Sequence, residues 1–383
     1  MDAANAFQSR DTPFEPIEVN LFEGSCGPGL PSNPQVRIRG ADSQEVRTGT
    51  ASLRSHQTAG FTRTTTIEAM VFFSPFEGHN TIELEFDRGV VRTTDAFFVT
   101  PQESTTTAAF DGRCTGHPFV GPQFVACTIS EGNEVFNVTA FSIDGGVSKL
   151  ASARLWTTAQ GRLVTTSSEL GWWPEGTALA DWRGTASLTS DALAVAANLT
   201  LVAVWQKDAV LVLRSRTDLS VELARIPLKP CDVQCSLGAS LVMNQDAILI
   251  SRRGSEQLAV FDGTWQLLPE TTGALWTVGR DDQLWRCNGN QIEWGRLEGR
   301  QVVISASGYT PVQCAAWPGG ERPSASGGNS ARSILMCPQV DGAAITWRAV
   351  KLFGGELGGG CFENSAYTYS GADVSRTRIA TFP

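Results

Sequence analysis

The sequence predicts an all-β protein whose main body is a β-propeller. Two observations carry this prediction: short apolar runs alternate with polar residues along most of the 383-residue chain, and a strand–turn–strand pattern recurs in its second half. Helical periodicity is nearly absent, and many short strands separated by turn residues are typical of sandwiches, barrels and propellers. The alternating runs include residues 81–86, 201–205, 209–213 and 247–250. Val, Thr, Phe and Trp are the residues in such runs that favour strands.

The recurring pattern has a period that suits propeller blades. Its polar turns fall at Gln160, Asp208, Asp246, Asp282 and Asp341. Their mean spacing is about 45 residues, which is close to the size of one blade of four short strands. A lone four-stranded sheet cannot bury both faces, and packing blades radially buries them. The long last interval contains the Gly-rich and Ser-rich segment 319–328, which indicates a flexible insertion.

One stretch resembles a blade of the tectonin family. Asp262 and Gly263 form a strong hairpin signal between two alternating runs. The following segment 274–286 reads ALWTVGRDDQLWR, and the tectonin repeat likewise places a Gly-x-Trp strand before a small-x-Trp-x-Val strand and a polar turn. The resemblance covers residues 261–286, and other segments such as 201–228 lack the Gly-x-Trp element. It implies a propeller fold and a binding role, often toward carbohydrate or lipopolysaccharide.

The aromatic residues divide the chain near residue 150. All 11 Trp lie at or after Trp156, whereas 15 of the 19 Phe lie at or before Phe141. This shift predicts a Phe-rich β region at 1–150 and Trp-rich propeller blades at 151–383. The first region forms either further blades, which close a ring of about seven, or a β-sandwich beside a propeller of about five blades.

The cysteines indicate disulfides. Of nine cysteines, Cys114 and Cys127 flank a predicted hairpin, and Cys231 and Cys235 flank a short loop, so both pairs are disulfide candidates. Disulfides favour an extracellular place, or one at a cell or virion surface. The first residues lack the features of a secretory signal, which leaves an intracellular assembly as the alternative. The cysteine spacing does not match a zinc site, and we expect no metal and no cofactor.

Charge and hydropathy exclude two classes of partner. The formal net charge is −9, and an acidic surface repels phosphate backbones, so we expect no nucleic-acid partner. No stretch approaches the roughly 18 consecutive apolar residues of a membrane-spanning helix, so we expect no membrane insertion.

The motifs of common enzymes are missing, and we expect no catalytic activity. The sequence holds no Gly-x-Ser-x-Gly elbow, no His-Glu-x-x-His helix and no phosphate-binding glycine loop. A glycosidase-like propeller enzyme is one alternative, and it requires paired carboxylates. Asp281 and Asp282 form the one adjacent acidic pair in the sequence. Neighbouring residues in a strand point to opposite faces, so these two carboxylates could not easily act together. We therefore interpret this pair as a solvated turn.

Tryptophans in loops are the candidate ligand-binding residues. Trp172 and Trp173 precede Pro174, and Trp317 precedes a Pro-Gly-Gly sequence, so all three are predicted in loops. Exposed tryptophans stack on sugars and form hot spots at protein interfaces, whereas buried ones would act as wedges between blades. We expect a non-enzymatic binding protein whose propeller loops recognise a glycan or protein partner. The alternative is a structural subunit of a virion, phage tail or other large assembly.

Overall fold

The computed structural model describes most of the chain, and the structural statements below concern the described residues. These are 7–9, 17–24, 32–40, 43–58, 64–99, 105–120, 124–130, 136–142, 144–174, 176–230, 238–279, 281–288, 291–310, 314–315, 322–325, 334–351, 356–362, 365–370 and 376–381. They form strands joined by turns, and two short 3-10 helices, η1 (Asp87–Gly89) and η2 (Leu179–Asp181).

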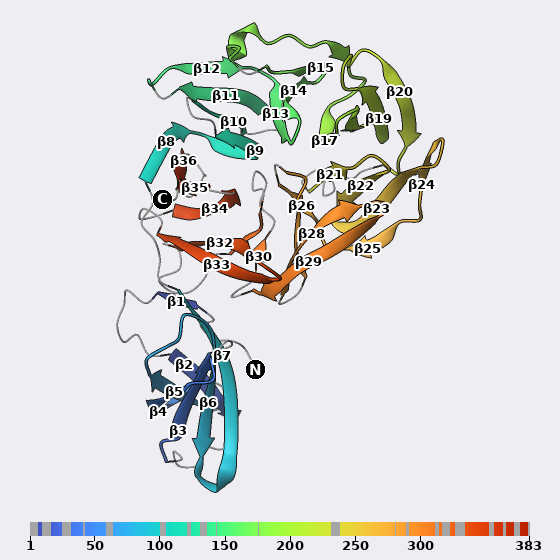
Figure 1. Ribbon diagram of the computed structural model, residues 1–383. Helices are drawn as coiled ribbons and strands as arrows, with labels where there is room; N and C mark the ends of the chain where they lie inside the picture. The colour runs from blue at the N-terminus through green and yellow to red at the C-terminus, as the bar shows by residue number, and fades with distance from the viewer. Residues whose placement is uncertain are drawn as a thin grey trace.

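The first seven strands form a sheet of their own, which lies outside the ring of the other sheets (Figure 1). The strands are β1 (Phe7–Ser9), β2 (Ile17–Gly24), β3 (Gln35–Gly40), β4 (Val46–Thr58), β5 (Thr64–Phe72), β6 (Gly78–Phe86) and β7 (Val90–Val99), in the order β1-β7-β6-β3-β4-β5-β2. Alternate residues of β3 and β6, including Ile38, Ile82 and Leu84, are fully buried. This period of two explains why the alternating sequence forms strands with one buried face.

The remaining described strands form six sheets, one of which has eight strands and comprises two four-stranded units. The resulting seven units of at least four strands are here named blades A to G in ring order. Blade A holds β9 (Arg113–Val120), β10 (Phe124–Ser130), β11 (Phe136–Ser142) and β12 (Val147–Leu150). Blade B holds β13 (Ala153–Thr158), β14 (Gly161–Thr166), β15 (Glu169–Trp172) and β16 (Ala186–Ser187), and blade C holds β17 (Ala192–Ala197), β18 (Leu201–Gln206), β19 (Val210–Ser215) and β20 (Glu222–Pro227).

Blade D has five strands: β21 (Ser240–Met243), β22 (Ala247–Arg252), β23 (Gly254–Phe261), β24 (Trp265–Leu267) and β25 (Thr271–Gly273). Blade E holds β26 (Thr277–Val278), β27 (Leu284–Asn288), β28 (Gln291–Glu298) and β29 (Gln301–Tyr309), and blade F holds β30 (Cys314–Ala315), β31 (Ser324–Ala325), β32 (Ile334–Asp341) and β33 (Ala344–Lys351). A parallel pairing of Ser307 with Ala344 joins the outer strands of blades E and F.

Blade G is built from both sides of the ring. It holds β34 (Glu356–Phe362), β35 (Ser365–Ser370) and β36 (Arg376–Thr381), and its fourth strand is β8 (Thr105–Asp111), which pairs antiparallel with β36. The chain therefore enters the ring as the outer strand of the last blade, and then begins the first blade at β9. The architecture is a seven-bladed β-propeller, which confirms the predicted fold class.

The first 150 residues contribute to both parts of the molecule. The sheets change between Val99 and Thr105, whereas the aromatic composition changes near residue 150. Residues 105–150 supply one complete blade and the closing strand β8. A separate N-terminal sheet and a ring of seven blades thus occur together.

The five strand–turn–strand segments found in the sequence do not occupy equivalent places. Three of them are the first hairpin of a blade, β13–β14, β21–β22 and β26–β27, whereas β18–β19 is a middle hairpin and β32–β33 a last one. Every adjacent pair in an antiparallel meander produces the same apolar–turn–apolar pattern. The unequal spacing of the turns follows from this difference in position.

Buried tryptophans fill the spaces between strands and blades. Trp205, Trp276 and Trp285 are at most 1% exposed. Trp205 packs with residues of blades C and D, including Leu241 and Ile248. Packing of this kind buries the faces that a single blade leaves open.

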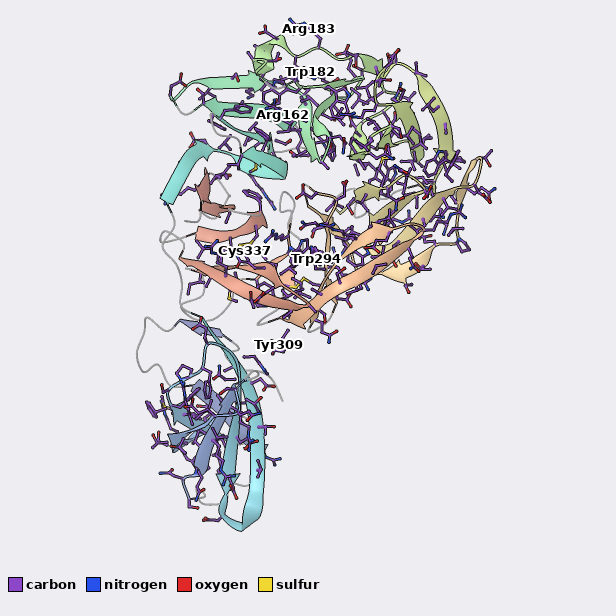
Figure 2. All side chains as sticks on the ribbon, in the orientation of Figure 1. Arg162, Trp182, Arg183, Trp294, Tyr309 and Cys337 are labelled. Carbon is purple, nitrogen blue, oxygen red and sulfur yellow. A yellow bond between two sulfur atoms is a disulfide. The ribbon has the colours of Figure 1, made fainter. Side chains whose placement is uncertain are left out.

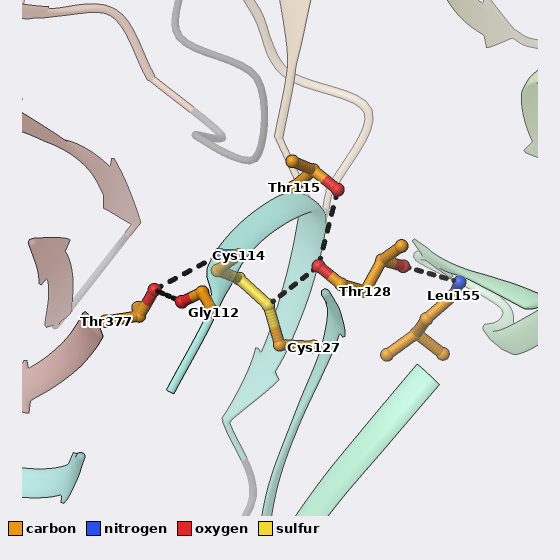
Figure 3. Close-up of a disulfide and its surroundings, with 7 residues drawn as sticks. All are labelled: Gly112, Cys114, Thr115, Cys127, Thr128, Leu155 and Thr377. Atoms are coloured by element: carbon orange, nitrogen blue, oxygen red, sulfur yellow. Dashed lines mark hydrogen bonds between the residues drawn. A yellow bond between two sulfur atoms is a disulfide. The ribbon is translucent and has the colours of Figure 1, made fainter. Parts of the chain in front are cut away.

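Three disulfides among the described residues tie the ring. Cys114 and Cys127, the pair predicted from the hairpin, join β9 to β10 within blade A (Figure 3). The other two join neighbouring blades: Cys287–Cys314 links blades E and F, and Cys337–Cys361 links blades F and G. Blade F has two strands of only two residues, β30 and β31, so covalent links compensate for its short hydrogen-bond ladder. The predicted pair Cys231 and Cys235 lies outside the described residues.

The junction of blades G and A depends on one buried hydroxyl. The Oγ1 atom of Thr377 donates to the carbonyl of Gly112 at 2.5 Å and accepts from the backbone N–H of Cys114 at 3.1 Å (Figure 3). Thr377 is fully buried. Nearby, Ile379 and Phe362 of blade G pack against the Cys114–Cys127 disulfide.

The N-terminal sheet contacts the ring at the end of β29. The rings of His79 and Tyr309 lie with their centroids 4.4 Å apart, and His79 Nε2 lies 3.3 Å from Asp95 Oδ1. Burial, followed by the Asp95 charge, raises the pKa of Tyr309 (labelled in Figure 2).

Replacing Thr377 by Val tests the closure of the ring. The change keeps the shape of the side chain but leaves a buried carbonyl and a buried N–H unpaired, so we expect a loss of about 2 kcal/mol in unfolding free energy. Urea unfolding followed by tryptophan fluorescence reports this loss for the ring alone, because all 11 Trp lie at or after Trp156. The exposed Thr264→Val variant is the control. Equal midpoints for the two variants would contradict the role of Thr377.

Candidate binding groove between blades D and E

The two described candidate tryptophans lie at the end of blade B. Trp172 is half-buried, and its indole N–H donates to the carbonyl of Arg216 at 3.3 Å. Trp173 is 3% exposed, donates to the carbonyl of Thr177 at 2.9 Å, and stacks against the Arg162 guanidinium, 4.5 Å from its ring centroid. Trp173 is therefore a core side chain, and part of Trp172 is accessible. Trp317 lies outside the described residues.

A distinct feature appears on blade D, where the outer strand is interrupted. Strands β24 and β25 both pair with β23, but at opposite ends: Phe261 pairs with Trp265, and Glu256 pairs with Thr271. Between them Leu268 still donates to the carbonyl of Leu258 at 2.8 Å. Pro269 follows and has no N–H to continue the ladder. The interruption opens the side of blade D that faces blade E.

The opening forms a groove of about 510 Å³ between the two blades. Blade D contributes Leu258 and Leu268 to its walls, and blade E contributes Val302 and Ile304. Leu268 is 38% and Ile304 40% exposed. An apolar surface that is open to solvent and bordered by polar side chains is typical of a binding site.

At one end of the groove the charges are paired. Arg286 Nε lies 2.5 Å from Glu293 Oε2, and its Nη1 lies 3.9 Å from Glu256 Oε2. The guanidinium lies 4.3 Å from the ring centroid of Trp276, whose indole N–H donates to Glu256 at 2.8 Å. Each charged group here has an opposite charge or a donor beside it, so this end is a fixed polar wall.

A second ion-pair cluster holds the interruption in place. Glu270 lies directly after Pro269, and its carboxylate is bonded to Arg252 and to Lys229, with Lys229 Nζ at 2.5 Å. The hydrogen bonds from Lys229, Ser255 and Arg252 lower the pKa of Glu270 to about 2. Glu270 is therefore ionised at neutral pH and anchors the interrupted segment, so the groove exists before any ligand arrives.

At the other end of the groove stands Arg300. Its Nη2 atom donates to the carbonyl of Phe261 at 2.7 Å and lies 3.7 Å from Asp262 Oδ1, and the side chain is 52% exposed. The groove is thus lined by Glu256, Gln257 and Leu258 on β23, and Arg300 borders it from blade E.

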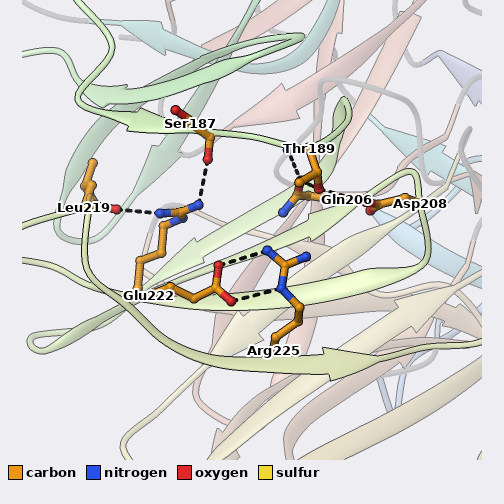
Figure 4. Close-up of polar contacts among 8 residues, drawn as sticks. Ser187, Thr189, Gln206, Asp208, Leu219, Glu222 and Arg225 are labelled. Atoms are coloured by element: carbon orange, nitrogen blue, oxygen red, sulfur yellow. Dashed lines mark hydrogen bonds and ion pairs between the residues drawn. The ribbon is translucent and has the colours of Figure 1, made fainter.

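Polar contacts elsewhere in the ring serve packing between and within blades (Figure 4). The buried Arg214 of blade C donates to the carbonyls of Leu219 and of Ser187, the latter in blade B. Burial lowers the pKa of Arg214. Glu222 and Arg225 form an exposed two-point pair on β20. These contacts support the scaffold, and none lies in the groove.

The acidic pair at the β26–β27 turn differs from the solvated turn that we expected. Asp281 is exposed, but Asp282 is half-buried and has a φ of 58°. Burial, followed by the charge of Asp281, raises the pKa of Asp282 to about 7. The second carboxylate is therefore partly withdrawn from water, at a residue whose backbone adopts the left-handed conformation.

The described part of the chain offers neither a metal cluster nor a membrane-spanning helix. No group of three or more His, Cys, Asp or Glu side chains there is arranged to hold a metal ion. No helix there has the length and apolar character to span a membrane.

Comparison with known proteins gives structural likeness without a family. No protein-family model and no curated protein matches the chain. Among solved structures, a chain of the mitotic checkpoint complex is 12% identical with a TM-score of 0.48, covering 73% of this chain and 92% of that chain. The WD40 β-propeller domain of Doa1 is 10% identical with a TM-score of 0.46, covering 73% and 97%. The tectonin resemblance of residues 261–286 stays a prediction.

Sequence reasoning missed the groove. Its signal is present as Leu268-Pro269, an apolar strand end followed by proline, between Trp265 and the polar residues 270–273. That signal predicts the end of a strand, but it does not show that the same edge resumes at Thr271. Nor does it show that β29 of the next blade forms the opposite wall.

Replacing Asp282 by Asn tests its burial. A carboxyl whose pKa is raised from 3.8 to about 7 by folding contributes stability that is present below pH 3.8 and lost as the pH rises to about 7. Asn tolerates the positive φ and carries no charge. We expect the variant to match the wild type at pH 4 and to exceed it at pH 8, by at most about 4 kcal/mol. Thermal unfolding at both pH values measures this, and parallel pH profiles would refute it.

Proposed function

We propose that this protein is a non-enzymatic binding protein that holds an extended segment of a protein partner in the groove between blades D and E. The observation that carries the proposal is the groove itself, whose apolar walls lie between two charged ends. Its volume of about 510 Å³ falls within the 300–1,000 Å³ typical of ligand sites.

The chemistry of the groove supports a peptide more than a sugar. Sugar binding commonly uses the open face of an aromatic ring, but Trp276 is 1% exposed and Arg286 lies over its ring. Leu258, Leu268 and Ile304 instead provide surfaces for aliphatic or aromatic side chains. Side chains of an extended peptide alternate, so those at every second position would face the groove.

The disulfides bear on where such binding takes place. The part of the chain that the structure describes holds three, and two of these join separate blades of the ring. Disulfides persist in oxidising environments. We accordingly propose an extracellular or surface location, where a propeller side groove is open to a partner.

Peptides selected on the immobilised full-length protein from a random library test the proposal. Replacing Leu268 and Ile304 together by Gln removes both exposed apolar contacts, so we expect about a tenfold loss of affinity, measured by fluorescence anisotropy. The Leu223→Gln variant is the matched control, because Leu223 is also exposed, at 56%, but lies on β20 of blade C. Selected peptides that bind the double variant as tightly as the wild type would rule out the groove as the site.

A further inference from the structure

We infer that the bound segment carries a carboxylate, and that this carboxylate pairs with Arg300 while an apolar side chain occupies the middle of the groove. The inference rests on the proposed function, because it names the chemistry of the partner segment at the same site. It follows from a difference between the two ends of the groove.

The cation at the first end is already used by the protein. Arg286 lies between Glu293, at 2.5 Å, and Glu256, at 3.9 Å, and its side chain is 20% exposed. Glu256 in turn accepts from the indole of Trp276. An incoming carboxylate would compete with two carboxylates already in place and would meet their repulsion.

The cation at the second end has remaining capacity. Arg300 uses Nη2 for the carbonyl of Phe261 at 2.7 Å, and the nearest carboxylate oxygen, Oδ1 of Asp262, lies 3.7 Å from the same atom. That distance is beyond a hydrogen bond, and the Asp262 side chain is 77% exposed. The Nε and Nη1 groups of Arg300 therefore remain available to a ligand. A guanidinium presents several N–H groups in a rigid plane that matches a carboxylate.

The contact to Phe261 also orients Arg300. Because Nη2 is bonded to the end of β23, the guanidinium is held beside the groove, and less side-chain entropy is lost on binding. The wall beside it is apolar, with Val302 and Ile304 on the strand that follows Arg300. A partly desolvated ion pair is stronger than one in open water. The formal net charge of −9 repels an acidic ligand on average, so a local cation favours its binding at this end of the groove.

Four fluorescein-labelled six-residue peptides test the inference with the full chain. All contain two leucines at alternate positions, and they carry Asp or Asn near the C-terminus, each with a free or an amidated terminus. We expect the Asp peptide with an amidated terminus to bind about tenfold more tightly than its Asn counterpart. Tight binding of the Asn peptide with a free terminus alone would assign the pairing to a terminal carboxylate.

Variants of Arg300 link this preference to the proposed contact. We expect Arg300→Gln to remove the preference for a carboxylate and Arg300→Lys to retain part of it, because lysine keeps the charge but loses the planar fork. Arg253→Gln, which removes one exposed positive charge at the β22–β23 turn, is the control and keeps the preference in full. A preference that survives Arg300→Gln would overturn the inference.

The outcomes separate this inference from the proposed function. If the peptides bind, if the Leu268 and Ile304 double replacement by Gln weakens them, and if carboxylate and amide peptides bind equally, the groove is the site and the carboxylate inference is wrong. If no peptide of either kind binds, the inference and the proposed function are both overturned.

Discussion

The pairing of β8 with β36 is the constraint on which the ring depends. It places the outer strand of blade G before the first strand of blade A, so that the last blade is completed by the chain that begins the first. Thr377 adds a buried bridge from β36 to Gly112 and Cys114. Without this closure, blades A and G would each expose an apolar face, including Ile129 and Ile379.

Ring closure fixes the blades side by side. As a result, the interrupted outer strand of blade D lies against blade E and forms a groove with it. The outer strand of blade D stops at Leu267 and resumes at Thr271. In an isolated sheet this interruption would leave an unpaired edge. Here β29 of blade E lies opposite it, so the two blades together form the two walls of the groove. The ion pairs of Glu270 keep the interrupted segment in one position. The groove therefore depends both on Pro269, which interrupts the outer strand of blade D, and on ring closure, which places blade E beside it.

Local patterns in the sequence predict much of the fold, because strands and hairpins depend on neighbouring residues. Alternation in residues 201–213 predicts β18 and β19, and the hairpin expected between Cys114 and Cys127 predicts that these two cysteines pair. The partnership of β8 with β36 joins segments more than 260 residues apart, so no local pattern reveals it. The groove is equally non-local: Leu268 and Ile304 become neighbours only because two blades pack. For the same reason the burial of Trp173, against Phe124 of blade A, does not follow from its place before a proline.

Hydrogen exchange followed by mass spectrometry tests ring closure most directly. Residues 105–111 form an outer strand whose protection comes from pairing with β36. The structure predicts that their amides exchange as slowly as those of β20 (Glu222–Pro227), the outer strand of blade C, which serves as an internal reference. Complete exchange of residues 105–111 within seconds, with β20 still protected, would contradict a ring closed by this strand.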